Sequence, residues 1–259
     1  MCLILFSYQQ DSDCPLIIAA NRDEFYSRPS DPAGFWEDAP HILAGRDRLC
    51  GGTWLGVDRY GRFSTVANYR DPSVDKTNTL SRGMLVSHFL LGDKTAEHYL
   101  RDVKQQCHRY NGFNLLAGDK SGFFYLSGPT GELSSLSPGL YGLSNELLNS
   151  AWPKVEKGKM QLGRILQSDD PVSCDDILEL LSDTTGFSDD SLPDTGIGIK
   201  WERILAPIFV RSKNYGTCCS TAVIINGDDD VTFAERTFNE QGQEVQTVTH
   251  HLMIDTTDK

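Results

Sequence analysis

Apolar runs in this chain come in pairs, and a short polar turn separates the members of each pair. Residues 3–8 and 16–20 lie on either side of such a turn, and the arrangement returns three times. Two apolar runs around a polar turn predict a β-hairpin, whose strands pair antiparallel. The chain is therefore expected to build antiparallel sheets. The later pairs are residues 53–57 with 63–67, 113–117 with 123–126, and 220–226 with 231–237, and a final strand is expected over 244–254.

Segments with helical spacing lie between the hairpins. Residues 80–91 and 152–167 carry apolar side chains at intervals of three and four, and Ser173 can cap a short helix over 173–181. Helices grouped between hairpins predict an α+β fold with antiparallel sheets. Residues 183–198 are rich in Asp, Thr, Gly and Ser, which predicts a mobile surface loop or a lid.

Charge and motif content exclude several functions. The formal net charge of −12 argues against a non-specific nucleic-acid binder and against a protein held on anionic lipid by its charge. No apolar run approaches the roughly 20 residues of a membrane span. No GxGxxG or Walker loop is present, so no nucleotide cofactor is expected, and no metal motif stands out. The seven cysteines form no CxxC pair, which fits reduced thiols and predicts a cytoplasmic protein.

Cys2 carries more potential chemistry than any other residue of the chain. Because cysteine is small, the preceding Met1 is removable, which would leave a residue with both a thiol and a free α-amine. An α-amine has a pKa of about 7.7–8.0, so it can accept the thiol proton near neutral pH. One residue would then supply nucleophile and base. The alternative is that position 2 holds a small apolar residue at the start of a strand.

Polar residues at the ends of predicted strands are candidates to surround Cys2. Because residues 16–20 pair with the first strand, Arg22 and Asp23 should lie beside Cys2, where arginine would favour the thiolate and aspartate could hold the amine. Asn68–Tyr69 and Asn145 also end apolar stretches, and a backbone N–H with an asparagine amide could form an oxyanion hole. Turn formation explains each of these residues equally well when it is taken alone.

Several motifs resemble those of the NRDE family and occur in the same order. This family is also called transport and Golgi organisation protein 2-like. The similarity runs from Met1 to about Phe238 and implies one domain over 1–259. The motifs are Asn-Arg-Asp-Glu-Phe-Tyr-Ser-Arg-Pro at 21–29, Gly-Gly-Thr-Trp-Leu-Gly at 51–56, Asn-Gly-Phe-Asn at 111–114, Tyr-Gly-Leu-Ser-Asn at 141–145, Tyr-Gly-Thr at 215–217 and Glu-Arg at 235–236.

That family is similar in turn to the N-terminal nucleophile (Ntn) hydrolases, which stack two antiparallel sheets between helical layers as an α-β-β-α sandwich. The resemblance implies the same four layers here. It assigns the nucleophile to Cys2, places Arg22 and Asp23 near the amine, and assigns the oxyanion donors to the block Asn68–Tyr69, through the Tyr69 N–H, and to Asn145. Relatives usually carry an arginine where this chain has Cys218, which removes one positive charge.

Three functions remain open at this stage, all with a small-molecule ligand. The family resemblance implies a haem-binding, haem-trafficking protein, and this is the function expected here, because Cys218 in place of the arginine weakens the case for hydrolysis. The local chemistry implies an amidohydrolase acting on a linear or cyclic amide, and a lipid or acyl-CoA binding module is the third possibility. For haem as cargo, the candidate iron ligands are Cys2, Cys14 and His88. The candidate wall and propionate partners are Trp54, Tyr69, Arg22 and Arg28.

Overall fold

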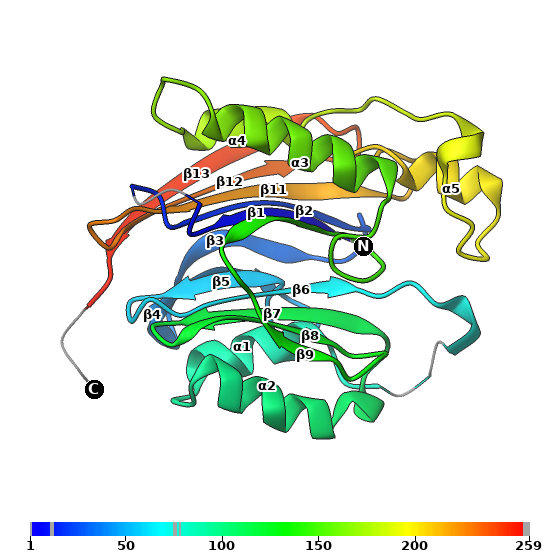
Figure 1. Cartoon of the computed structure of the whole chain (residues 1–259). Helices are drawn as coiled ribbons and strands as arrows, with labels where there is room; N and C mark the ends of the chain where they lie inside the picture. The colour runs from blue at the N-terminus through cyan, green and yellow to red at the C-terminus, as the bar shows by residue number, and fades with distance from the viewer. Residues whose placement is uncertain (1, 11–12, 75–76, 78, 256–259) are drawn as a thin grey trace.

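Two antiparallel sheets packed face to face form the centre of the protein (Figure 1). The computed structural model describes residues 2–10, 13–74, 77 and 79–255. One sheet has six strands, in spatial order β10 (Gly139–Leu143), β1 (Cys2–Tyr8), β2 (Leu16–Phe25), β11 (Tyr215–Ile225), β12 (Asp230–Phe238) and β13 (Glu244–Met253).

The second sheet has seven strands, and each pairs with its neighbour in the sequence. Their order is β3 (Ser30–Trp36), β4 (Ala39–Asp47), β5 (Leu55–Asp58), β6 (Phe63–Asn68), β7 (Phe113–Asp119), β8 (Gly122–Ser127) and β9 (Leu133–Ser135). This sheet is thus a meander made from one continuous stretch of chain.

Helices cover the outer face of each sheet (Figure 1). α1 (Gly83–Leu91) and α2 (Ala96–Gln105) pack on the seven-stranded sheet, and α3 (Pro153–Leu166) and α4 (Cys174–Leu180) pack on the six-stranded sheet. The short α5 (Ile199–Leu205) follows later in the chain. The layers therefore run helix, sheet, sheet, helix, which confirms the predicted α+β, α-β-β-α architecture. Short 3-10 helices occur at Pro72–Val74, Cys107–Arg109 and Asp189–Ser191.

Residues 3–6 of β1 are all apolar, whereas a strand with one exposed face would alternate apolar and polar residues. Ile4 and Phe6 belong to the core between the two sheets, while Leu3 and Leu5 belong to the core under α3 and α4. Because both faces of this strand are buried, apolar side chains are favoured at each of these four positions. The first residue of this strand, Cys2, packs against the core between the sheets.

All four predicted hairpins are present, as β1–β2, β5–β6, β7–β8 and β11–β12. The helices expected over 80–91, 152–167 and 173–181 are α1, α3 and α4, each slightly shorter. The sequence interpretation missed the hairpin of β3 and β4 and the helix α2. Among the described residues, no helix is both long enough and apolar enough to cross a membrane.

Candidate functional site

Cys2 and Arg22 face each other at the end of the β1–β2 hairpin. The two residues are direct partners in the strand register, so their side chains emerge on the same face of the sheet. Arg22 is only 5% exposed, and its guanidinium lies 4.4 Å from the centroid of the Trp54 ring. The hairpin register thus places a thiol beside a buried, stacked guanidinium.

A cleft of about 230 Å³ opens at this point between the two sheets. It brings together many of the residues that the sequence singled out, although they come from three strands and two loops. The predicted site residues that line it are Cys2, Arg22, Asp23, Arg28, Trp54 and Asn68. Glu24, Asp47, Cys50, Arg82 and Asn111 also line it, and the sequence interpretation gave these no role.

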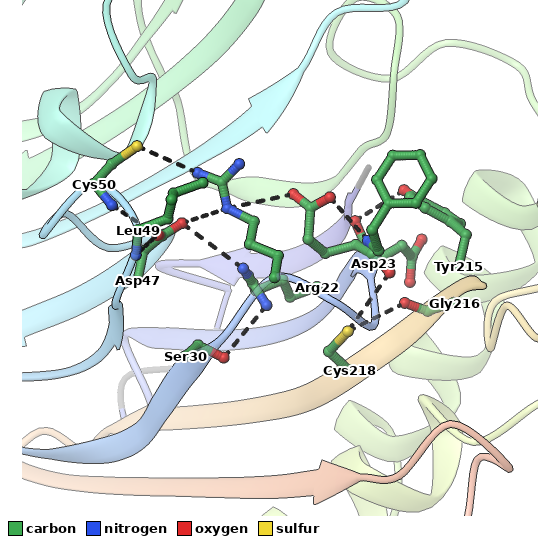
Figure 2. Close-up of polar contacts among 12 residues, drawn as sticks. Arg22, Asp23, Ser30, Asp47, Leu49, Cys50, Tyr215, Gly216 and Cys218 are labelled. Carbon is green, nitrogen blue, oxygen red and sulfur yellow. Dashed lines mark hydrogen bonds and ion pairs between the residues drawn. The ribbon is translucent and has the colours of Figure 1, made fainter.

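Asp47 organises the arginines of the cleft (Figure 2). Its Oδ2 accepts a hydrogen bond of 2.6 Å from Arg28 Nε and lies 3.9 Å from Arg22 Nη2. Its Oδ1 accepts the N–H groups of Leu49 and Cys50 at 2.8 and 3.0 Å. Burial alone would raise the pKa of Asp47, but the bond from Arg28 and these N–H groups lower it. The carboxylate therefore stays charged at neutral pH.

The Cys2 thiol is protonated at neutral pH in this environment. Burial raises its pKa, Asp23 adds to the rise, and Arg22 opposes it. A nucleophilic thiolate at Cys2 thus requires a nearby base.

Asp23 lies at the end of β2 and is buried (Figure 2). Its Oδ1 accepts a hydrogen bond of 2.7 Å from Thr217 Oγ1, and its carbonyl oxygen accepts one of 2.8 Å from Tyr215 Oη. Burial raises the pKa of Asp23, and the charge of Lys154 lowers it. The Tyr-Gly-Thr motif at 215–217 therefore holds Asp23 by its backbone, through Tyr215, and by its carboxyl group, through Thr217.

Asn21, which opens the NRDE motif, has a structural role. Its amide nitrogen donates to the carbonyl oxygens of Leu181 and Ile208, both at 2.9 Å, and its Oδ1 accepts a bond of 2.6 Å from Ser220 Oγ. These contacts attach β2 to the segments that follow α4 and α5. The four residues Asn-Arg-Asp-Glu thus combine a fold-stabilising asparagine with three residues that line the cleft.

Tyr69 and Asn145 lie outside the lining of the cleft. The Tyr69 N–H donates to the Gly112 carbonyl at 2.9 Å, and the Asn145 amide nitrogen donates to the Asn68 carbonyl at 2.9 Å. Ser144, next to Asn145, donates from Oγ to the Cys2 carbonyl at 3.3 Å. The Ser144 bond brings Asn145 near Cys2 in space. The Tyr69 N–H and one of the two N–H groups of the Asn145 amide are already used in bonds of the fold.

Lys154, Arg70 and Glu202 form a buried charged cluster next to Asp23, which the sequence interpretation missed. The Arg70 guanidinium pairs with Glu202 at 2.9 Å, and these side chains are 7% and 3% exposed. Glu202 also accepts bonds from the N–H and hydroxyl of Thr195, at 2.9 and 2.6 Å. Residues 183–198, expected to be a surface loop or a lid, are therefore anchored at Thr195 to a buried ion pair.

Lys154 lies in the first turn of α3, where a helix usually exposes lysine. The chain around α5 covers it, so it is 3% exposed and donates to the Leu205 carbonyl at 2.9 Å. Burial lowers its pKa to about 8, although the charge of Asp23 acts in the opposite direction. No local pattern could have revealed this, because the covering segment lies about 50 residues further along the chain.

We expect Lys154 to make stability depend on pH above 8. The unfolded chain keeps this lysine protonated to about pH 10.5, whereas the folded chain loses the proton at about 8. The unfolded state then binds more protons, so its free energy relative to the folded state rises with pH. The unfolding free energy of the wild type minus that of Lys154→Met should grow by up to about 1.4 kcal/mol per pH unit between pH 8 and 10.

Urea unfolding at pH 7, 8 and 9 measures this difference. Lys157→Met is the matched control for loss of a lysine from the same helix, because its ammonium pairs with Asp183 at 2.6 Å instead. A difference for Lys154→Met that stays flat or falls from pH 8 to 9 contradicts the expectation.

Cys14 and His88, the other candidate iron ligands, lie away from the cleft. Cys14 follows the turn at the opposite end of β1, about 20 Å from Cys2 given the seven-residue length of that strand. His88 is exposed on α1 and lines a separate groove of about 580 Å³ with Phe89 and Tyr99. Across residues 2–10, 13–74, 77 and 79–255, no three His, Cys, Asp or Glu side chains gather so as to hold a metal ion.

Cys218 lies at an irregularity in the β2–β11 pairing, where the register shifts between Thr217 and Cys219. Its Sγ is 3.6 Å from the Glu24 carbonyl and 3.5 Å from the Gly216 carbonyl (Figure 2). Burial raises the pKa of this thiol to about 11. A neutral thiol therefore occupies the place where the family resemblance predicts a charged arginine.

Comparison with known proteins identifies relatives along most of the chain. Residues 1–240 match the family described as Transport and Golgi organisation 2. The Transport and Golgi organization 2 homolog of Mus musculus is 36% identical over 256 residues, covering 91% of this chain and 92% of that protein. The homolog of Homo sapiens is 36% identical over 261 residues, covering 93% and 94%. Among solved structures, a mutant conjugated bile acid hydrolase from Clostridium perfringens superposes with a TM-score of 0.49 at 9% identity, covering 100% of both chains.

Proposed function

The chain belongs to the Transport and Golgi organisation 2 family, and on that premise we propose that it hydrolyses an amide bond with Cys2 as the nucleophile. One observation carries the proposal: Cys2 faces Arg22 on adjacent strands, in a cleft that Asp23 and Asn68 also line. A cysteine beside a cationic side chain, partly accessible from a cleft, is the usual environment of a nucleophilic thiol.

The proposed reaction begins with removal of Met1, which frees the α-amine of Cys2. That amine acts as the base that Cys2 requires and takes the thiol proton, and Arg22 stabilises the thiolate. The sulfur then attacks the amide carbonyl, a C–S bond forms, and the C–N bond breaks as the α-ammonium gives its proton to the leaving amine. Water hydrolyses the thioester, with the same amine accepting one proton from the water and returning it to the sulfur.

Asn145 is the proposed donor to the oxyanion. A side-chain amide carries two N–H groups, and one of them in Asn145 already donates to the Asn68 carbonyl. Stabilisation of the oxyanion would use the second. The bond to Asn68 then has the role of fixing the orientation of the amide.

The size of the cleft favours a small group around the scissile bond. Its volume of about 230 Å³ lies below the roughly 300–1,000 Å³ of pockets that bury drug-sized ligands. A cytoplasmic location is proposed with this function, because no disulfide joins cysteines of the described residues, as expected in a reducing compartment.

Mass spectrometry tests the proposal directly. The intact mass of the purified chain is expected to lack Met1, and incubation with linear N-acyl amines, N-acyl amino acids and lactams should give cleavage of at least one class. Acid quenching during turnover should trap an acyl group on the Cys2 peptide. A fully retained Met1, or turnover without an adduct on Cys2, contradicts the mechanism.

Haem binding is a second proposal, which the same cleft supports less well. Cys2 could ligate iron as a thiolate, Arg22 and Arg28 could pair with the two carboxylates, and Trp54 offers an aromatic surface. The small volume of the cleft counts against a ligand as large as haem. Titrations with hemin and with an acyl-CoA distinguish haem binding from acyl-CoA binding. If the cleft binds haem through Cys2, hemin should give a saturable Soret band that weakens in Cys2→Ala. An unchanged band in that variant would indicate that Cys14 or His88, rather than Cys2, ligates the iron.

A further inference from the structure

A second pocket, of about 380 Å³, lies next to the Cys2 cleft. Arg28 and Trp54 line both spaces. In the strand register Arg22 faces Cys2 on β1 and Cys219 on β11, and these two cysteines line the cleft and the second pocket respectively. Arg22 with its stacked Trp54 therefore separates the two spaces. We name the second one the Cys218 pocket, after the half-buried cysteine in its wall.

Of the two side chains that separate the cleft from the Cys218 pocket, Trp54 is held in place and Arg22 can move. The Trp54 ring lies so close to Gly45 that a Cβ at that position would come within 2.5 Å of it. Arg22, by contrast, makes long polar contacts with the described residues, 3.5 Å to Ser30 Oγ and 3.9 Å to Asp47 Oδ2. A ligand that extends from one space into the other would therefore displace the guanidinium rather than the ring.

Much of the wall of the Cys218 pocket is apolar. It includes Tyr26, Pro29, Pro32, Trp54, Phe238 and Val245. The neutral thiol of Cys218 adds to this surface, since burial raises its pKa to about 11.

The charged residues of the wall are Arg28, Asp31, Glu235 and Glu240. Arg28 pairs with Asp47 and Asp31 pairs with Arg48. Glu235 accepts the Ala33 N–H at 2.8 Å and the Thr221 hydroxyl at 3.2 Å. Glu240 is exposed, and its charge would repel an anion. The pocket thus favours an uncharged ligand over an anionic one.

We propose that the Cys218 pocket binds an uncharged, apolar substituent of the substrate while the amide itself lies in the Cys2 cleft. The position of the amide rests on the proposed function, whereas the pocket as a binding site rests on its own walls. Its volume of about 380 Å³ falls within the range of small-molecule sites. The two spaces together would then accommodate a substrate with a compact polar part and an apolar part.

Alkylation of Cys2 tests the pocket without requiring turnover. The sulfur attacks the CH2 carbon of a chloroacetamide, so that an S–C bond forms, the C–Cl bond breaks with loss of chloride, and the thiol proton goes to the buffer. Three probes are compared by peptide mass mapping over time: chloroacetamide, N-benzylchloroacetamide and N-chloroacetylglycine. The N-benzyl probe is expected to label Cys2 about tenfold faster than chloroacetamide and with saturation, because its ring leaves water. The anionic probe should show no such gain.

Val245→Glu tests whether the Cys218 pocket causes the gain. Val245 is 64% exposed on β13, so a glutamate is tolerated there and brings a carboxylate to the pocket wall. The N-benzyl gain should disappear while the rate with chloroacetamide stays unchanged. Met253→Glu, at the other end of the same strand and 60% exposed, is the control that should keep the gain.

The outcomes separate this inference from the proposed function. Equal rates for the N-benzyl and parent probes, a gain that survives Val245→Glu, or failure of all three probes to label Cys2 overturns the pocket proposal. A preserved N-benzyl gain in a protein that cleaves no amide supports the pocket and overturns the hydrolase.

Discussion

Replacement of Cys2 by alanine is expected to reduce turnover of any amide that the wild type cleaves by about 10³-fold or more. Alanine removes the sulfur that forms the covalent bond and leaves the α-amine, Arg22 and Asp23 in place. Loss of a nucleophile from a covalent mechanism has effects of this size, because the remaining groups cannot replace the attacking atom. The measurement is kcat/KM on the substrate class found by mass spectrometry, with circular dichroism to confirm that the variant folds.

Cys50→Ala is the matched control for Cys2. Cys50 lines the same cleft and is exposed, and its thiol contacts Arg28 Nη2 at 3.7 Å. Its removal should leave kcat/KM within about twofold of the wild type, since a weakly bonded exposed thiol contributes little to folding or binding. Turnover by Cys2→Ala within tenfold of the wild type excludes Cys2 as the nucleophile.

Glu202→Gln is expected to lower the free energy of unfolding by about 3–5 kcal/mol. The change removes the carboxylate that pairs with the Arg70 guanidinium at a position that is 7% exposed, and removing one partner of a buried ion pair has a cost of this size. The Arg70 guanidinium also stacks 5.1 Å from the centroid of the Trp152 ring, so it cannot turn to solvent without losing that contact. Urea unfolding at pH 7 measures the loss.

Two further variants define the origin of that loss. Asp102→Asn breaks the ion pair between Asp102 and Lys94, which are 53% and 58% exposed. This change should alter the free energy of unfolding little. Arg70→Met combined with Glu202→Met removes both charges and should recover a large part of the loss. If Glu202→Gln is no more destabilising than Asp102→Asn, the cluster does not support the fold in the way that we infer.

The hairpins were predictable because each has a short polar turn between continuous apolar runs. The β3–β4 hairpin lacks that signal. Its pairing shifts register between Asp31 and Gly34 and again between Phe35 and Trp36, so inward and outward positions do not alternate regularly. α2 was also missed, although its buried residues Ala96, Leu100 and Val103 fall at helical spacing and Thr95 caps its first turn.

The part of the site that depends on strand register was predictable from the sequence. Once residues 16–20 pair with the first strand, Arg22 must lie opposite Cys2, and the structure has this pairing. The cluster of Arg70, Lys154 and Glu202 depends on where α5 returns to the molecule, which no local pattern encodes. The Tyr69 N–H is a similar case, since its bond to Gly112 joins two segments that are distant in the sequence.

The two sheets differ in how far along the chain their strands must find each other, and this difference bears on the order of folding. Every strand of the seven-stranded sheet pairs with its sequence neighbour, so no pairing between described residues of that sheet joins positions further apart than Phe63 and Gly118. β2, however, pairs with β11, and the bond between Asn21 and Ser220 joins residues 199 positions apart. Pairings at such separation form slowly, because a long loop must close first. The wall of the cleft that carries Arg22 and Asp23 is therefore completed late, when β11 docks beside β2, and a chain truncated before β11 would leave that edge of β2 open to association with other chains.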